Sequence, residues 1–301
     1  MAQSKREKRR ISGWLILDKP FDMTSTQAVG KVRWLFGAAK AGHAGTLDPL
    51  ATGILPIALG EATKAVPNVQ DGEKCYRFAI TWGTSTTTDD AEGEVLETSD
   101  HRATREQLET ILPQFTGDVV QVPPVYSAIK VSGERAYDLA RAGEKVALSA
   151  RTVEISSLEL ISHSDSETVL EAHCGKGTYV RALARDIAEH LGTRGHVGSL
   201  RRTAVGGFSE ARAVTMDQLE AASREERDAM LETVSSALTD VPEVRLYGDQ
   251  VTAVRHGNPV LLMGAGAPVM LEEAWASFAG EVVAIGAVEA GRFQPRRVFN
   301  L

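Results

Sequence analysis

Residues 42–59 read Gly-His-Ala-Gly-Thr-Leu-Asp-Pro-Leu-Ala-Thr-Gly-Ile-Leu-Pro-Ile-Ala-Leu, a crowded loop followed directly by an apolar run. Three glycines and Pro49 exclude one regular element across residues 42–53, so this stretch is predicted to be a shaped loop. It displays His43 and Asp48, and Asp48 is its only ionised acid. The run 54–59 is typical of a buried strand, in which the proline indicates an edge or a bulge.

Two interpretations of Asp48 are open from the residues alone. An aspartate before a proline is typical of a helix N-cap with the proline in the first helical position. Alternatively, the rigid loop holds a carboxylate that acts as a nucleophile or base. Aspartate has a pKa of about 3.9 in water, and a neighbouring arginine such as Arg181 would keep it ionised even in a dry pocket. Arg181 itself also fits an ordinary surface arginine.

His43 has several interpretations as well. A loop histidine can be a metal ligand, a general base, a polar wedge or simply an exposed residue. Because Asp48 is the only other strong ligand nearby, no metal centre is expected here. The chain's two cysteines, Cys75 and Cys174, are too few for a disulfide scaffold and lack the paired spacing of a zinc site. Both are therefore predicted to be core residues.

Outward from the loop, the patterns predict alternating strands and helices. The run 14–17 is typical of a strand, and a helix follows that is capped by Ser25 and ended by Gly37. The two-residue alternation over 75–82 predicts a strand in which Tyr76 shares a face with large apolar side chains. Further predicted elements are a helix over 105–115, strands over 153–160 and 168–174, an amphipathic helix from Thr178 to Gly192, and acidic helices over 216–238.

Composition agrees with an ordinary folded protein. The chain has 301 residues, of which 43% are hydrophobic, and no apolar run reaches the length of a bilayer-spanning helix or a secretory core. We therefore expect a cytoplasmic protein. The net charge is -7, but residues 1–60 hold nine Lys/Arg against four Asp/Glu, while residues 61–118 hold five against twelve. This uneven distribution is compatible with a basic face for a polyanion, or with a patchy solvated surface.

Several segments together resemble the TruB family of tRNA pseudouridine synthases. The loop 42–53 matches the family's catalytic loop almost letter for letter, and Lys19-Pro20 and Lys74-Cys75-Tyr76 resemble two further motifs. The other matching segments are Thr88-Asp89 with Gly93, Pro124-Val125-Tyr126-Ser127-Ala128 with Lys130 and Gly133, and Gly177-Thr178-Tyr179-Val180-Arg181 with Asp186. The resemblance covers residues 11–240. One departure is Cys174-Gly175, where the family has Cys-Ser.

The resemblance implies a fold, a reaction and a set of site residues. The fold is α+β, a mixed and largely antiparallel sheet flanked by helices, with a small C-terminal β-rich domain. The reaction is isomerisation of uridine to pseudouridine at position 55 in the T-loop of tRNA, with no metal or other cofactor. Asp48 would be the catalytic nucleophile and would pair with Arg181, and His43 would fill the stack that the flipped base leaves. Tyr76, Tyr179 and Leu200, which residue type alone would class as packing residues, would form the base pocket.

The composition and the resemblance together predict how the chain is organised and what it binds. Residues 1–10 would be a basic, disordered tail, 11–243 the catalytic domain, and 244–301 a PUA-like RNA-binding domain. An excursion over 124–150 would clamp the RNA. The candidate RNA contacts, which should make binding salt-dependent, are Lys19, Lys130, Arg141, Arg201 and Arg202. The expected partner is the T-arm of tRNA, with no membrane and no obligate protein partner, and the expected state is a monomer.

Two other functional classes remain open. The chain could be a tRNA-binding or tRNA-folding module without catalysis, although such a module has no need of the set formed by Asp48, Tyr76 and Arg181. It could also be an aspartate-based nucleoside hydrolase, which would release free uracil. The RNA product of a reaction with a T-arm substrate separates these possibilities.

Overall fold

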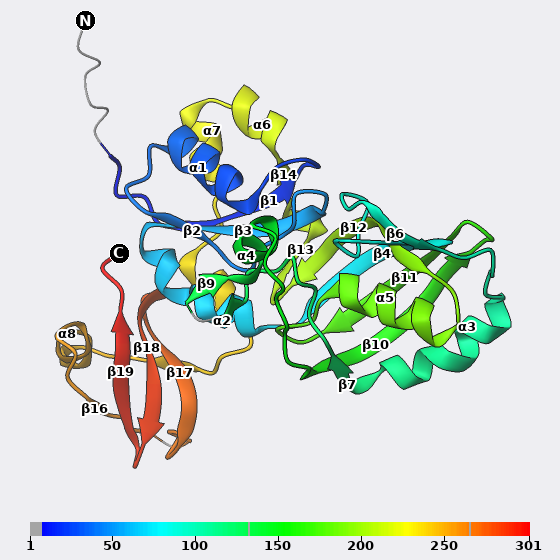
Figure 1. Ribbon diagram of the computed structural model, residues 1–301. Helices are drawn as coiled ribbons and strands as arrows, with labels where there is room; N and C mark the ends of the chain where they lie inside the picture. Colours follow the sequence, from blue (N-terminus) through cyan, green and yellow to red (C-terminus); the bar gives the residue numbers. More distant parts are fainter. Residues whose placement is uncertain (1–7, 132, 265) are drawn as a thin grey trace, which may run out of the picture. The chain divides into compact units, whose positions relative to one another are not determined.

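The structure is a computed structural model, which describes residues 8–131, 133–264 and 266–301 (Figure 1). The chain divides into two compact units. Unit 1 comprises Met1–Asp48, Ile54–Asp71 and Val205–Leu301, and unit 2 comprises Pro49–Gly53 and Gly72–Ala204. Among the described helices, none has both the length and the apolar character needed to cross a membrane.

The part of unit 1 before residue 240 contains both strands and helices. Its elements before residue 240 are β1 (Gly13–Lys19), α1 (Ser25–Phe36), β2 (Ala41–His43), β3 (Thr52–Leu59), α2 (Val66–Asp71), β13 (Phe208–Ser209), β14 (Val214–Thr215), α6 (Met216–Ala221) and α7 (Arg224–Ala229), with 3-10 turns at Gly60–Ala65, Glu210–Arg212 and Val234–Ala237. Strand β1 pairs in parallel with β14, and β2 pairs in antiparallel with β3. The predicted strand over 14–17, the buried strand over 54–59 and the acidic helices over 216–238 are confirmed.

Helix α1 ends as predicted but begins differently. Gly37 caps the C-terminus with φ 61°, the left-handed conformation that glycine adopts without strain. The N-cap is Thr24 rather than Ser25, and Thr24 forms a capping box with Gln27. The predicted Ser25 cap is therefore wrong. The hydroxyl of Ser25 instead donates to the carbonyl of Leu47 and accepts from its N–H, at 3.0 and 2.9 Å.

The C-terminal part of unit 1 is a small β-rich region, as predicted. It contains β15 (Glu243–Arg245), α8 (Asp249–Arg255), β16 (Val260–Leu261), β17 (Leu271–Phe278), β18 (Glu281–Glu289) and β19 (Arg292–Val298). Its five strands form one sheet in the order β15-β17-β18-β19-β16. One core of this region lies around Phe293 and Val254. Val282, Ile285 and Phe299 belong instead to a core cluster that also contains Trp14. The domain boundary near residue 244 stays a prediction.

Unit 2 is built on an antiparallel sheet. Its elements are β4 (Lys74–Trp82), β5 (Thr84–Thr86), β6 (Val95–Thr98), α3 (Arg105–Ile111), β7 (Gly117–Gln121), β8 (Lys130–Val131), β9 (Glu134–Arg135), α4 (Ala136–Arg141), β10 (Arg151–His163), β11 (Glu167–Cys174), α5 (Val180–His190) and β12 (Gly195–Val205), with a 3-10 turn at Leu112–Phe115. The order β4-β11-β10-β7 is antiparallel throughout, whereas the first residues of β3 pair with β12 in parallel. The mixed, largely antiparallel sheet is confirmed.

Helix α5 packs against β4. A Cβ on Gly195 would lie 2.9 Å from Ile80 and 3.1 Å from Ala188, so glycine allows the strands and the helix to approach. The predicted helix over 178–192 is confirmed, but its predicted cap is wrong. The N-cap position is Tyr179, and the hydroxyl of Thr178 donates to the carbonyl of Gly175 instead.

Candidate active site

The loop 42–53 is held at both ends by backbone pairing. His43 is the last residue of β2 and lies opposite Ile57 of β3, and the next residue, Ala44, donates its N–H to the carbonyl of Pro56 at 2.9 Å. Further along, Leu47 is buried and bonded through both backbone groups to Ser25. The loop is therefore a fixed structure rather than a flexible connection, because its backbone groups are bonded to two neighbouring elements.

Asp48 directly follows the anchored residue Leu47 and is half-buried. Pro49 and Leu50 form a turn, and β3 begins at Thr52. No helix starts at Asp48, so the interpretation of Asp48 as a helix N-cap is wrong. What remains from the two sequence interpretations is a carboxylate whose position is set by a bonded loop.

Gly53 ends the loop where β3 meets β12. Its φ is 97°, and a Cβ at this position would lie 2.2 Å from the carbonyl oxygen of Arg202. Both the conformation and the close approach require glycine. The glycine thus fixes how the last loop residues pair with β12, where Arg201 lies opposite Thr52.

Tyr76 occupies the predicted position on β4. It lies opposite Ala172 of β11 and is half-buried, whereas Phe78 and Ile80 on the same face are buried. A tyrosine at the end of an apolar row, with part of its ring still accessible, can present that ring to a ligand.

Tyr179 and Leu200 lie on other elements of unit 2. Tyr179 is half-buried at the start of α5, and its backbone N–H donates to Oε1 of Gln121 at 3.2 Å while its carbonyl accepts from the same side-chain amide at 3.4 Å. Leu200 is buried in β12. Gln121 is itself buried, and sequence reasoning missed its contribution because a glutamine in a strand carries no distinctive signal.

Arg181 is buried and fully oriented by protein groups, which excludes its interpretation as a surface arginine. Its Nη1 donates to the carbonyl of Thr88 at 3.0 Å, and its Nη2 donates to the carbonyl of Tyr126 at 2.9 Å. The carboxylate of Asp90 lies 3.4 Å from Nη1, and Asp90 is also buried. The rigid guanidinium fork is thus held in one orientation by several partners.

A second arginine one turn further along α5 forms a parallel ion-pair network. Arg185 contacts Asp89 at 2.9 Å and Asp186 at 2.8 Å. Burial raises the pKa of Asp89 and of Asp186, although the arginine opposes the shift. Burial also opposes the charge of Arg185, but the two carboxylates outweigh it and raise its pKa. Residues 88–90 therefore bind both arginines, Arg181 through Thr88 and Asp90 and Arg185 through Asp89. The resemblance of Thr88-Asp89 to a family motif did not predict these contacts.

The candidate RNA contacts differ in accessibility. Lys130 and Arg141 are exposed, and the guanidinium of Arg141 lies 5.7 Å from the ring centroid of Tyr137. Arg201 is half-buried, and its Nη1 donates to the hydroxyl of Thr52 at 3.4 Å. The other two, Lys19 and Arg202, are buried, which direct contact with RNA does not allow.

The buried Lys19 has a structural role instead. Its ammonium donates to the carbonyls of Pro20 and Met23 at 2.9 and 2.7 Å, which fixes the turn before α1. In the basic tail, residues 1–7 lie outside the described part of the chain. Arg9, by contrast, is described, and it pairs with Ala38 and forms an ion pair with Asp228 at 2.5 Å.

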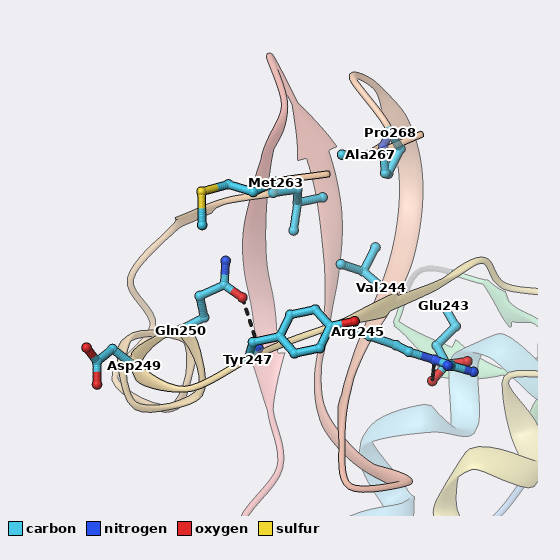
Figure 2. A pocket seen from close by; sticks show the side chains of 10 residues that line it. Glu243, Val244, Arg245, Tyr247, Asp249, Gln250, Met263, Ala267 and Pro268 are labelled. Carbon is cyan, nitrogen blue, oxygen red and sulfur yellow. Dashed lines mark hydrogen bonds and ion pairs between the residues drawn. The ribbon is translucent and has the colours of Figure 1, made fainter. Parts of the chain in front are cut away.

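The C-terminal region carries a pocket of about 440 Å³ (Figure 2). Arg245 lines it from the end of β15 and Tyr247 from the segment that follows, while Met263 and Pro268 line it from the loop before β17. Tyr247 is 69% exposed, while its backbone N–H donates to the side chain of Gln250 at 3.0 Å. An exposed aromatic ring can stack on a nucleic-acid base, and a neighbouring arginine adds a favourable charge.

The candidate residues fall into two groups. His43 and Asp48 lie in unit 1, while Tyr76, Tyr179, Arg181 and Leu200 lie in unit 2. The pairing of Asp48 with Arg181 therefore stays a prediction.

Comparison with known proteins identifies the family. Residues 33–180 match the N-terminal domain of TruB family pseudouridylate synthases, and residues 181–241 match the C-terminal domain of tRNA pseudouridylate synthase B. The chain belongs to the TruB family. It is 53% identical over 301 residues to tRNA pseudouridine synthase B of Agrobacterium fabrum, which covers 97% of this chain and 96% of the relative. It is 50% identical over 320 residues to the protein of the same name from Mesorhizobium japonicum, and the match covers 99% of this chain and 98% of that relative.

Solved structures agree with the TruB assignment at the level of the fold. A chain in the crystal structure of a Cbf5-Nop10-Gar1 complex matches with a TM-score of 0.73 and 23% identity, over 96% of this chain and 84% of that chain. A chain of an H/ACA RNP bound to a substrate RNA matches with a TM-score of 0.72 and 21% identity, over 96% of this chain and 85% of that chain. Residues 242–301 lie beyond both TruB family matches.

Proposed function

We propose that this protein isomerises uridine to pseudouridine at position 55 in the T-loop of tRNA. The observation that carries the proposal is the similarity of about half of all residues, over nearly the full chain, to relatives named tRNA pseudouridine synthase B. The anchored loop with Asp48, the half-exposed Tyr76 and the oriented Arg181 support it.

The reaction breaks the bond between N1 of uracil and C1′ of ribose, turns the base and joins C5 to C1′. N1 gains a proton and C5 loses one, so the reaction is balanced without a redox partner or a co-substrate. In this proposal Asp48 is the nucleophile that attacks the sugar. In the alternative route the same carboxylate acts as a base and promotes a glycal intermediate. Arg181 keeps the Asp48 carboxylate ionised in a site from which water is excluded. Its contacts with Thr88, Tyr126 and Asp90 within unit 2 would hold it ready for that pairing.

Access to the uridine requires the base to leave its stack, which costs a few kcal/mol. In the proposal, His43 fills the vacated position while Tyr76 packs on the extruded uracil. Tyr179 and Leu200 complete the base pocket. A fixed loop suits this exchange because His43 and Asp48 are then presented together at a small cost in conformational entropy.

RNA recognition is assigned to cations that are exposed or half-buried and to the C-terminal region. Lys130, Arg141 and Arg201 would contact phosphates, with the excursion over 124–150 as a clamp. Residues 244–301 would form the PUA-like RNA-binding domain, with Tyr247 in its pocket. We further propose that the protein acts as a monomer in the cytoplasm on tRNA, without an obligate protein partner.

The test is conversion of a synthetic T-arm stem-loop whose target uridine carries tritium at C5. Isomerisation releases the tritium to water and gives a nucleoside that has the mass of unlabelled uridine but a different chromatographic retention. Release of free uracil would indicate a hydrolase, and binding without conversion would indicate the non-catalytic RNA-binding module. Exhaustive chelation should leave the rate unchanged, and a loss that added metal restores would overturn the cofactor-free reaction.

A further inference from the structure

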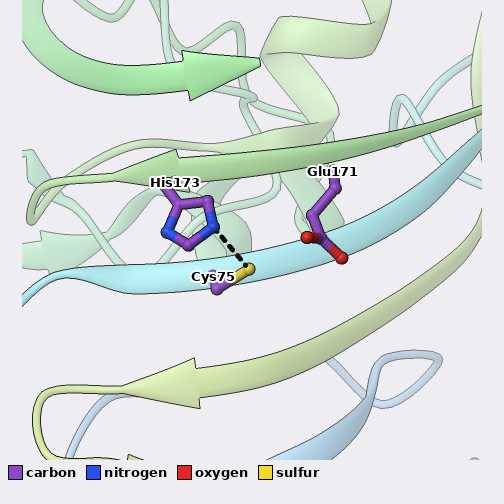
Figure 3. A group of neighbouring side chains, drawn as sticks. All are labelled: Cys75, Glu171 and His173. Carbon is purple, nitrogen blue, oxygen red and sulfur yellow. Dashed lines mark hydrogen bonds between the residues drawn. The ribbon is translucent and has the colours of Figure 1, made fainter. Parts of the chain in front are cut away.

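A group of three possible metal ligands lies on strands β4 and β11 of unit 2 (Figure 3). Cys75 and His173 are register partners across the two strands, and Glu171 lies two residues from His173 on the same face. Strand alternation places Cys75 on the face opposite to Tyr76. Among the residues that the structure describes, this is the one group whose ligand atoms all lie within 4.8 Å of one another.

The distances fit a tetrahedral metal ion. The Cys75 sulfur and Nε2 of His173 are 3.4 Å apart. A zinc ion bound at about 2.3 Å to sulfur and about 2.0–2.1 Å to nitrogen places those two ligand atoms about 3.6 Å apart when the angle is tetrahedral. Binding therefore requires almost no movement of the two strands, which the sheet hydrogen bonds already hold together.

The surroundings of His173 are those of a metal-binding histidine. Its Nδ1 lies 3.5 Å from Oε2 of Glu73, and the other oxygen of that carboxylate accepts a hydrogen bond from Ser156 at 2.5 Å. A carboxylate at Nδ1 places the ring proton there and leaves the lone pair of Nε2 directed toward the ligand group. Metal-bound histidines commonly show this arrangement.

The third ligand, Glu171, can offer one of its two carboxylate oxygens to a metal ion. Arg77 donates to Oε2 of Glu171 at 2.7 and 3.2 Å, so Oε1 is the oxygen that a metal would take. Cys75 is buried, while His173 and Glu171 are partly exposed, with side-chain exposures of 40% and 22%. A cation can therefore enter from the surface, and water can complete a fourth position.

We propose that Cys75, Glu171 and His173 form a site for a divalent cation that accepts sulfur, nitrogen and oxygen ligands, with zinc as the best fit. The ion replaces the thiol proton of Cys75, which leaves to solvent. The site clamps β4 to β11 beside Tyr76 and takes no part in the isomerisation. It stabilises the folded unit in proportion to the logarithm of the metal concentration once that concentration exceeds the dissociation constant.

The test is titration of the full chain with Co²⁺, a spectroscopic substitute for zinc, under reducing conditions. We expect a thiolate-to-cobalt charge-transfer band that saturates at one equivalent and disappears when Zn²⁺ is added. Cys75→Ser should abolish the band. Cys174→Ser is the matched control and should retain it, because Cys174 is buried outside the group.

Two further variants keep the proposal testable if Cys75→Ser fails to fold. His173→Gln should remove the band, and Glu73→Gln should weaken Co²⁺ binding by about 10- to 100-fold because it loosens the ring orientation. Absence of a band at excess Co²⁺, or a band that survives Cys75→Ser in folded protein, would overturn the proposal. The readout uses no RNA, so it is independent of the proposed function.

Discussion

The arginine at the start of α5 and the cations of the excursion over 124–150 represent two ways of using positive charge. Arg181 is buried, and two carbonyls and a carboxylate fix its guanidinium. Lys130 and Arg141 are exposed on a short hairpin and a short helix. A group that must hold another group in one geometry needs a rigid environment, whereas a group that meets phosphates needs solvent access. Changes in the two regions should therefore affect different quantities.

The largest effect is expected at the anchored loop. Asp48→Asn should abolish pseudouridine formation on a T-arm stem-loop, because the amide keeps the shape of the side chain but is not a nucleophile. Binding of the RNA should be largely preserved. Tritium release and a filter-binding titration measure the two properties. Substantial turnover by the purified variant would remove Asp48 from the role of nucleophile.

Arg181→Gln should lower both turnover and stability. The substitution removes the cationic partner of the buried Asp90 carboxylate and leaves the negative charge of Asp90 uncompensated. Such a loss typically lowers the free energy of unfolding by about 3–5 kcal/mol. Chemical denaturation followed by circular dichroism measures the loss. The control is Arg194→Gln, whose ion pair with Glu97 is substantially exposed and should contribute less than about 1 kcal/mol. Equal losses in the two variants would contradict the structural role of Arg181.

Gly53→Ala separates a close contact from an unfavourable backbone conformation. Gly53 and Gly133 share φ 97°, but a Cβ at Gly53 would meet the carbonyl of Arg202 at 2.2 Å, while one at Gly133 meets nothing within 4 Å. Both substitutions carry the conformational penalty of about 1–3 kcal/mol. Gly53→Ala should cost roughly 1–3 kcal/mol more, because the strands must move apart. Thermal unfolding of the two variants measures the difference.

His43→Ala should slow the reaction without stopping it. Loss of a side chain that stacks in place of a base costs about 1–3 kcal/mol, which corresponds to roughly a 5- to 150-fold lower kcat/KM. A T-arm substrate with a mismatched, already unstacked target should recover part of the rate, because its base is easier to extrude. If His43→Ala were as inactive as Asp48→Asn, the histidine would have a chemical role.

The smallest effects are expected in the excursion. Lys130→Gln and Arg141→Gln should each weaken RNA binding modestly and leave kcat unchanged. Each should also reduce the slope of log K against log salt concentration by about one. Lys31→Gln is a control, since this cation pairs with Glu220 at 2.8 Å in unit 1. An unchanged salt slope in both excursion variants would show that these cations do not meet phosphates.

Local patterns predicted the elements well, and the environment of single charged groups poorly. The alternation around Tyr76 and the glycine after α1 are read directly from residue type and spacing. Thr24 and Ser25 are both good N-caps, and only the tertiary bond of Ser25 to the loop decides between them. Arg181 is held by two backbone carbonyls, which leave no mark in the sequence.

The same limit explains the buried cations and the cysteine group. Lysine and arginine are usually exposed, so the burial of Lys19 and Arg202 required the structure. Cys75 and His173 are far apart in the sequence, and only the register of β4 against β11 places them opposite each other. A single sequence gives the period of a strand but not the partner residue across the sheet.

The core cluster that joins Trp14 to Phe299 has a consequence for biosynthesis. The strand that carries Trp14 leaves the ribosome early, but its packing partners include side chains made almost three hundred residues later. Until translation reaches Phe299, the apolar side chains that pack against it in the folded protein stay without this contact. They then depend on chaperones or on non-native contacts to be shielded from water. A nascent chain stalled shortly before this residue should therefore stay protease-sensitive around β1, and release of a longer chain should protect it.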